Sequence, residues 1–235
     1  MAPDDSLTTT VVNLLSRYRT YAWAVSVTRA YGGVPAEERR ELRRARLIET
    51  SLDCLHDDGL AAVSVRSVCA RARLTPRYFY ESFADLDQLL VATVDAVSDE
   101  VAASALAALD AAPDDLPRQV RAAIDAGYGV VVADRRKATA LLVAASGHGA
   151  LRERRHAVIT RFADLVIDRL PVLTAFGVAE RRQARATALF LMGGATEVVE
   201  AVLAGRLRIS RAALVDHLTA MWLAVLGGTG RSSQG

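Results

Sequence analysis

The spacing of apolar residues is the feature that most limits the folds open to this chain. From Glu37 onward apolar residues recur three and four positions apart, beginning with Leu42, Leu47, Ile48, Leu52 and Leu55. This is the period of an amphipathic α-helix, whereas a half-buried strand alternates every second residue. No stretch after residue 36 has a convincing strand pattern. The sequence therefore predicts an all-α protein.

Turn-forming residues divide the pattern into helices. Asp57, Asp58 and Gly59 end the first helix, because glycine commonly follows a helix C-terminus. Further helices are expected at about residues 64–70, from Pro76 onward, and at about 84–110, 116–133, 135–146, 150–170, 179–204 and 210–226. The helices form a smaller N-terminal unit, 37–95, and a larger body, 96–226.

The two ends of the chain differ from this helical middle. Residues 1–36 have poor periodicity and contain Arg17, Arg19 and Arg29, so we expect an extension outside the main fold, either an arm or a disordered segment. Residues 227–235 are rich in Gly and Ser and are expected to be a disordered tail.

Charge is informative through its distribution. The net charge of +2 does not indicate a nucleic-acid-binding protein. However, Leu60 to Tyr80 contains four arginines and no acid, and Glu81 to Pro117 contains nine acids and no base. A locally basic segment favours contact with a polyanion over a small footprint, although chance clustering of solvated charges would look the same.

Residues that support catalysis or bind metals form no recognisable pattern. The histidines are scattered, and Cys54 and Cys69 lie in predicted helices without metal-binding spacing. We therefore expect no enzyme activity, no cofactor and no metal site. Without an evident signal peptide or an apolar run of membrane-spanning length, the chain is expected to be reduced, cytoplasmic and without membrane contact.

A pair of short helices joined by a tight turn lies between Arg46 and Leu90. Thr75 as N-cap and Pro76 at the first helical position mark the start of the second, which is basic and aromatic. The major groove of DNA admits one helix, whose first residues reach base edges while the preceding helix crosses the backbone. The segment therefore predicts a helix-turn-helix.

The segment ARLTPRYFYESFADLDQLL, Ala72 to Leu90, resembles the signature of the TetR family of transcriptional regulators. Thr75 matches the cap of the family's recognition helix, and Phe79, Tyr80 and Phe83 match its Leu-Tyr-x-x-Phe core. The resemblance implies a TetR-like fold, in which a long helix joins an N-terminal three-helix helix-turn-helix domain to a C-terminal helical bundle. It also implies a homodimer that binds a palindromic double-stranded DNA operator and senses a small-molecule effector.

Position within this resemblance assigns the DNA contacts. Arg77 would read a guanine through two parallel hydrogen bonds or hold a phosphate, and Tyr80 would bind a phosphate or serve only in packing. The expected DNA-binding residues are Ser64, Arg66, Arg73, Thr75, Pro76, Arg77, Tyr78 and Tyr80.

Some positions depart from the family pattern. Arg73 stands where the family has its turn glycine, so a left-handed residue there would cost stability unless the turn differs. Ser82 replaces a histidine, and Leu86 replaces a lysine that contacts a DNA phosphate in the family. One phosphate contact is therefore expected to be missing, unless Arg73 or the N-terminal arginines replace it.

The resemblance places the dimer interface and the effector pocket in the body. Apolar stripes with small residues on the last two helices fit a four-helix bundle between subunits, although an ordinary core within one chain would look the same. Glu197 interrupts an apolar helix, and a buried carboxylate needs a partner. The expected ligand-binding residues, each of which could instead be a core residue, are Tyr128, His148, Phe162, Met192, Thr196, Glu197 and Trp222.

The predicted function is therefore a ligand-responsive repressor released from its operator by a small, mostly hydrophobic molecule. The alternative is a helical adaptor that binds only protein. An adaptor would explain the helical bundle, but it would not explain a Thr-Pro-Arg-Tyr helix start in an acid-free segment.

Overall fold

The computed structural model describes residues 35–146, 149–169 and 178–229 of the 235-residue chain. Its elements are helices, and no strand occurs within these ranges, which confirms the predicted all-α fold class. The elements are α2 (Ala36–Asp58), the 3₁₀ turn η2 (Leu60–Ala62), α3 (Val65–Ala72), α4 (Pro76–Tyr80), α5 (Leu86–Ala111), α6 (Leu116–Ala133), α7 (Arg135–Ala145), α8 (Gly149–Arg169), α10 (Val178–Leu203) and α11 (Arg211–Thr229).

Capping side chains explain where the predicted ends differ from the observed ones. Helix α5 begins at Leu86 because the Asp85 carboxylate accepts a hydrogen bond from the Gln88 backbone N–H at 2.8 Å. Helix α11 continues to Thr229, into the segment that was expected to be disordered from residue 227. Most of the predicted extension, residues 1–34, lies outside the described residues.

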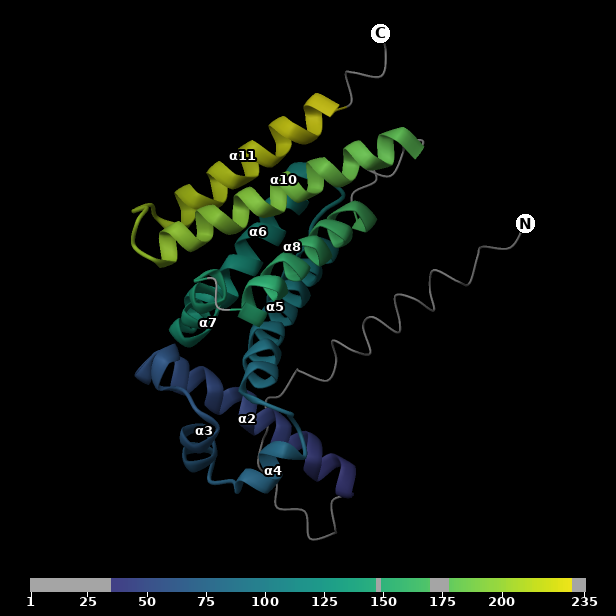
Figure 1. Ribbon diagram of the computed structural model, residues 1–235. Coiled ribbons are helices and arrows are strands. Elements are labelled where there is room, and N and C mark those ends of the chain that lie inside the picture. Colours follow the sequence, from purple (N-terminus) through teal and green to yellow (C-terminus); the bar gives the residue numbers. More distant parts are fainter. Residues whose placement is uncertain (1–34, 147–148, 170–177, 230–235) are drawn as a thin grey trace, which may run out of the picture.

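The helices form a small unit and a larger body (Figure 1). Helices α2, α3 and α4 gather at one end of the molecule, and α10 and α11 lie side by side at the other. Helix α5 runs from the first unit into the body, where it packs against α6, α7 and α8. One long helix thus connects the helix-turn-helix to the body, as the TetR-like architecture predicts.

The two units share one hydrophobic core. A cluster of buried side chains joins Leu47 of α2 and Phe79 of α4 to Leu89 of α5, Ala140 of α7 and Leu151 of α8. A second cluster joins α6, α10 and α11 through Val120, Ala184, Leu191, Trp222 and Leu226. A continuous cluster of buried side chains therefore crosses the boundary expected at residue 95.

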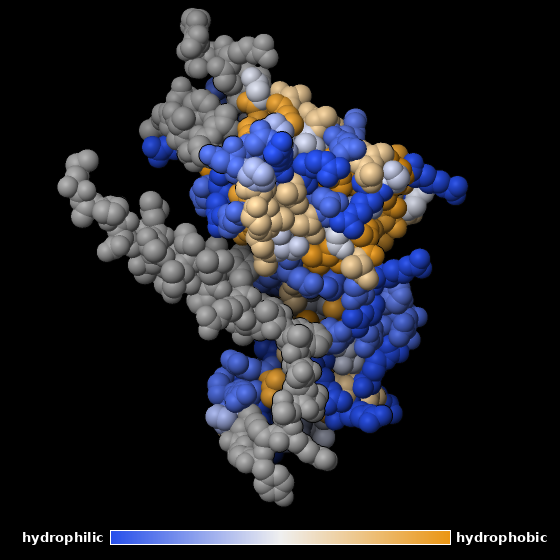
Figure 2. Space-filling model, turned by 180° about the vertical axis from the view of Figure 1, so that it is seen from behind, coloured by the Kyte–Doolittle hydropathy of each residue, from blue (hydrophilic) through white to orange (hydrophobic). Residues whose placement is uncertain are grey.

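Helix α10 is more apolar than the sequence interpretation allowed. Its segment Arg181–Leu203 is long and apolar enough to cross a membrane by length and composition alone, so the expectation that no run reaches that length was wrong. Only 17% of its most apolar window is buried within the protomer. Figure 2 shows apolar residues gathered over the body and mostly hydrophilic residues over the α2–α4 end, where grey atoms do not cover them.

Candidate nucleic-acid interface and effector cavity

Hydroxyl groups fix the start of α3, the first helix of the helix-turn-helix. The Ser64 hydroxyl accepts a hydrogen bond from the Ser67 backbone N–H at 3.1 Å, and the Ser67 hydroxyl accepts one from the Ser64 backbone N–H at 2.9 Å. This reciprocal pair is a capping box, which satisfies two donors that a helix start leaves free. Ser64 therefore has a structural role, and its side chain remains exposed.

Arg73 adopts the left-handed conformation of the glycine it replaces. Its φ is 54° and its ψ is 43°. Among the residues that the structure describes, no other non-glycine residue has a positive φ. The Arg73 N–H bonds the Ala70 carbonyl at 3.2 Å, and the Leu74 N–H bonds the Cys69 carbonyl at 3.0 Å, so the turn keeps the geometry usual after a helix C-terminus. An L-residue with a side chain is strained there by about 1 kcal/mol relative to glycine.

The turn leads directly into α4, the expected recognition helix. Pro76 occupies its first position, as predicted, and the Thr75 carbonyl accepts a bond from the Tyr78 N–H at 3.0 Å. Thr75 is the N-cap residue, as predicted, although its hydroxyl makes no capping hydrogen bond. This hydroxyl is exposed beside the first turn of α4.

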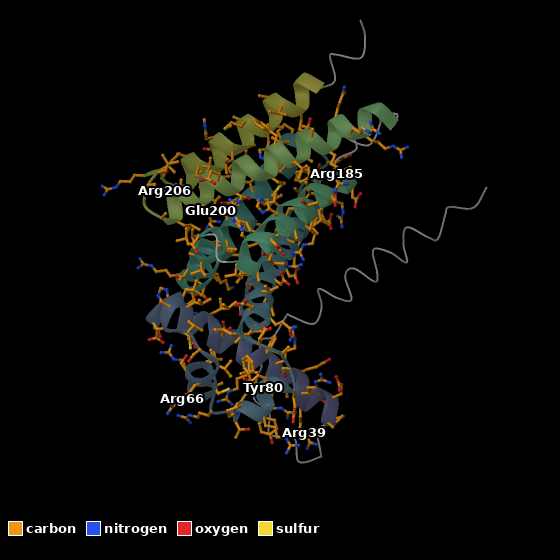
Figure 3. All side chains as sticks on the ribbon, viewed as in Figure 1. Arg39, Arg66, Tyr80, Arg185, Glu200 and Arg206 are labelled. Atoms are coloured by element: carbon orange, nitrogen blue, oxygen red, sulfur yellow. The ribbon has the colours of Figure 1, made fainter. Side chains whose placement is uncertain are left out.

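Alternation of buried and exposed side chains orients α4. Phe79 is fully buried, with its ring centroid 5.3 Å from that of Tyr80 and 5.8 Å from that of Phe83. The Arg77 side chain is 85% exposed, and Tyr80 is 60% exposed. Burial of Phe79 thus turns polar and aromatic side chains outward. Each of the predicted DNA-binding residues is exposed, and Figure 3 shows Arg66 and Tyr80 at the same end of the molecule.

Arginines of α2 support α4, which the sequence interpretation missed. The Arg43 guanidinium lies 4.6 Å from the Tyr78 ring centroid and donates to Glu81 at 3.3 Å. Arg77 donates to the other oxygen of Glu81, also at 3.3 Å. Arg40, Arg43 and Arg44 are spaced three and four residues apart, which places them on one face of α2, and this spacing could have indicated that the face meets another element. Glu81 therefore holds the Arg77 guanidinium close to the guanidinium of Arg43.

Leu86 packs against the shared core, so it provides no phosphate contact at the position of the family's lysine. Arg44 of α2 lies with its guanidinium 4.3 Å from the Phe83 ring centroid and donates to the Ser82 carbonyl at 3.2 Å. That arginine stabilises the segment between α4 and α5.

The body has a partly open cavity of about 260 Å³ between α5, α6, α7, α8, α10 and α11. Most of its lining is aliphatic or aromatic. The structure places these predicted ligand-binding residues around it: Tyr128, Phe162, Met192, Thr196 and Trp222. His148 lies outside the described residues. Contact of these residues with an effector stays a prediction.

Glu197 was the wrong choice of buried carboxylate. Its side chain is 61% exposed and lies away from the cavity lining, 3.5 Å from Arg155 and 3.6 Å from Arg206. Glu200 lines the cavity instead, with 8% of its side chain exposed, and its two oxygens accept bonds from Arg155 at 2.9 Å each. This hydrogen bonding raises the pKa of the Arg155 guanidinium. Figure 3 shows Glu200 in the body, far from Tyr80.

The helical phase explains the error. Met192, Thr196 and Glu200 follow one another at four-residue intervals on α10, and all line the cavity. Residues four apart share a helix face, whereas Glu197 is rotated away from that face. The spacing in the sequence was therefore sufficient to choose Glu200.

A second charged cluster joins the body to α2. The Arg136 guanidinium of α7 lies 2.6 Å from Glu49 and 2.7 Å from Asp53, both on α2, and 2.7 Å from Asp134. Its hydrogen bonds lower the pKa of the Asp134 carboxyl. Helix α7 also lines the cavity through Leu141 and Ala144. One short helix therefore contacts both the cavity and the helix-turn-helix unit.

The apolar stripes of α10 and α11, which were expected at the dimer interface, differ in how far their residues are buried within the protomer. Those buried within the protomer, and so part of its own core, are Ala184, Ala188, Leu191, Leu214, Leu218 and Leu226. Ala195, Val198 and Val202 are partly buried, whereas Gly194 and Met221 are exposed. Phe190 of α10, outside the stripes, is 64% exposed. The stripes thus contribute to the protomer's own core and also leave side chains exposed on α10 and α11, so pairing through these helices stays a prediction.

Comparison with known proteins identifies the fold. No protein-family model matches the chain, and no curated protein matches it in sequence. Solved structures do match. A TetR-like transcriptional regulator from Rhodococcus sp. RHA1 is 20% identical with a TM-score of 0.57, covering 83% of this chain and 100% of its own. A putative transcriptional regulator from Pseudomonas aeruginosa PAO1 is 21% identical with a TM-score of 0.62, covering 82% of this chain and 94% of its own.

The fatty acid degradation regulator FadR from Bacillus halodurans is 13% identical with a TM-score of 0.61, covering 77% of this chain and 94% of its own. The alignments cover nearly the whole length of these neighbours, so the match includes the body as well as the helix-turn-helix. The predicted resemblance is thus confirmed at the level of architecture: the chain has the fold of TetR-like transcriptional regulators.

Proposed function

We propose that this protein is a DNA-binding transcriptional repressor that a small, mostly apolar molecule releases from its operator. The observation that carries the proposal is the outward face of α3 and α4. Arg77, Tyr78 and Tyr80 are exposed on a helix whose other side is anchored by the fully buried Phe79. A rigid helix that presents an arginine and hydroxyls suits base edges and phosphates in a major groove.

A homodimer is part of this proposal. Helix-turn-helix proteins read two half-sites about one DNA turn apart, roughly 34–36 Å, with a two-fold axis that matches the operator palindrome. The exposed apolar side chains of Phe190 and Met221 on adjacent helices support pairing through α10 and α11. These helices lie at the end opposite α3 and α4, so pairing there leaves both recognition helices free (Figure 1).

Two helices support communication between cavity and DNA. Helix α5 begins beside α4 and lines the cavity further along through Val94, Ser98 and Val101. Helix α7 lines the cavity and holds α2 through Arg136. We propose that an effector shifts both helices and so changes the separation of the recognition helices. The effector must bind the conformation that does not fit DNA more tightly than the conformation that does. With equal affinities it would not shift the equilibrium between the two conformations.

Fluorescence anisotropy with DNA from upstream of the protein's own gene and from neighbouring intergenic regions tests the proposal. Arg77→Ala should weaken binding about 5- to 150-fold, since a bidentate base contact contributes roughly 1–3 kcal/mol of discrimination. Arg118→Ala is the matched control. Like Arg77, Arg118 is highly exposed, at 71%, and pairs with a carboxylate close by in sequence, Asp115, but it lies on α6 in the body. This variant should bind DNA like the wild type.

The outcome separates the two candidate functions. Absence of DNA binding at low salt, or an unchanged affinity in Arg77→Ala, contradicts the DNA-reading role assigned to α4. A folded dimer that binds none of these DNAs would instead fit the protein-binding adaptor.

A further inference from the structure

The polar groups that line the cavity of the body are already paired, with few exceptions. The Ser98 hydroxyl donates to the Val94 carbonyl at 2.8 Å, and the Thr196 hydroxyl donates to the Met192 carbonyl at 2.7 Å. Each of these hydroxyls is therefore occupied by its own helix. Neither needs a ligand to satisfy it.

The charged groups of the lining are paired as well. Arg155 and Glu200 form a two-bond ion pair whose net charge is zero, and Arg169 lies 2.7 Å from Asp110. A ligand carboxylate that took Arg155 would leave Glu200, which is almost fully buried, without its partner. A ligand cation that took Glu200 would do the same to Arg155. Leaving one member of a buried pair alone is strongly unfavourable.

Tyr128 and Trp222 are different. The hydroxyl of Tyr128 and the indole N–H of Trp222 have no hydrogen-bond partner among the described residues. Trp222 belongs to the packed cluster between α6, α10 and α11 and is 9% exposed. Tyr128 is only half-buried, so it is the more exposed of the two residues. Burial raises the pKa of the Tyr128 phenol, which keeps it a neutral donor.

We infer that the effector is an uncharged, predominantly apolar molecule with one hydrogen-bond acceptor, which the Tyr128 hydroxyl binds. The inference rests on the proposed function, because it names the ligand class of the same cavity. At about 260 Å³ the cavity is slightly smaller than usual drug-sized pockets, which favours a small ligand. A charged ligand is excluded from this class because no unpaired counter-charge faces the cavity within the described residues.

Three probes with one apolar body test the charge requirement. Decan-1-ol, decanoate and decylammonium are titrated into the full-length protein by calorimetry at pH 7.4, below their micelle-forming concentrations. Decan-1-ol should bind at least tenfold more tightly than either ion. Equal or tighter binding of decanoate or decylammonium would overturn the inference, and so would failure of all three to bind. DNA binding is measured in a separate assay. Failure of the ligand inference can therefore be distinguished from failure of the proposed regulator function.

Two variants that each remove one hydroxyl from the lining test the role of Tyr128. Tyr128→Phe removes the unpaired hydroxyl and should lower decan-1-ol affinity about three- to tenfold, the range for one hydrogen bond. Thr196→Val removes a hydroxyl that is already bonded within α10 and should leave the affinity unchanged. Equal effects of the two variants, or no effect of Tyr128→Phe, would overturn the assignment. The circular dichroism spectrum of each variant checks that it is folded.

Discussion

Removing one member of the Arg155–Glu200 pair should destabilise the protein far more than removing both. Arg155→Met leaves the Glu200 carboxylate, with 8% of its side chain exposed, beside a thioether in place of two hydrogen bonds of 2.9 Å. Breaking a buried pair in this way costs about 3–5 kcal/mol. The lower end is expected, because the Arg155 side chain is 23% exposed and water can reach part of the site. We therefore expect a loss of about 3 kcal/mol.

The double variant Arg155→Met, Glu200→Leu replaces the pair by apolar side chains that continue the lining of the cavity. Such replacements are often neutral or stabilising, so its stability should return to within about 1 kcal/mol of the wild type. The control is Arg121→Met, which breaks an ion pair of 2.7 Å with Asp216 between α6 and α11. Both of those side chains are about half exposed or more, so the loss should stay below about 1 kcal/mol.

Urea unfolding followed by circular dichroism measures these differences at one fixed protein concentration, because the proposed dimerisation would make the apparent stability depend on concentration. Near-additive losses in the double variant would refute the reasoning, since they would show that the two side chains act independently. A loss in Arg155→Met no larger than in Arg121→Met would show that burial of Glu200 does not matter.

Two further predictions concern the turn and the cluster at α2. Arg73→Gly should raise the free energy of unfolding by about 1 kcal/mol, because glycine adopts a φ of 54° without strain; an unchanged or lower urea midpoint would contradict this. Asp134→Asn should reduce the acid sensitivity of folding. Arg136 lowers the pKa of Asp134, so that carboxylate stabilises the fold above its ordinary pKa of 3.8, and the contribution is lost as the pH falls through the lowered value. Parallel stability-against-pH curves for wild type and variant would refute it.

Local signals predicted most of the fold. The start of α3 follows from Ser64, and the start of α5, expected at about residue 84, could have been placed at Leu86 from Asp85. Each side chain accepts a hydrogen bond from a backbone N–H three residues along the chain, so a short window of sequence contains the whole interaction. The buried Phe79 and exposed Arg77 follow in the same way from one helical turn. Such features are predictable because both partners are neighbours in the chain.

Interactions between distant segments were not predictable in this way. Arg136 contacts Glu49 and Asp53, which lie 87 and 83 positions earlier in the sequence. Nothing in the pattern around α7 indicates which carboxylates it meets, because that depends on how α7 packs across α2. The Arg43–Tyr78 contact depends in the same way on the packing of α2 against α4.

The shared core gives these distant contacts their functional weight. If the helix-turn-helix and the body had separate cores, ligand binding in the cavity could affect the DNA-binding helices only by tilting α5. Here Ala140 and Ala144 of α7 are buried in the same cluster as Leu47 of α2 and Phe79 of α4. Because a packed interior does not deform freely, a shift of α7 at the cavity must move or unpack α2. Arg136 adds an ionic link between the same two helices, so under the proposed function α7 would connect the cavity to α2, as α5 would connect it to α4.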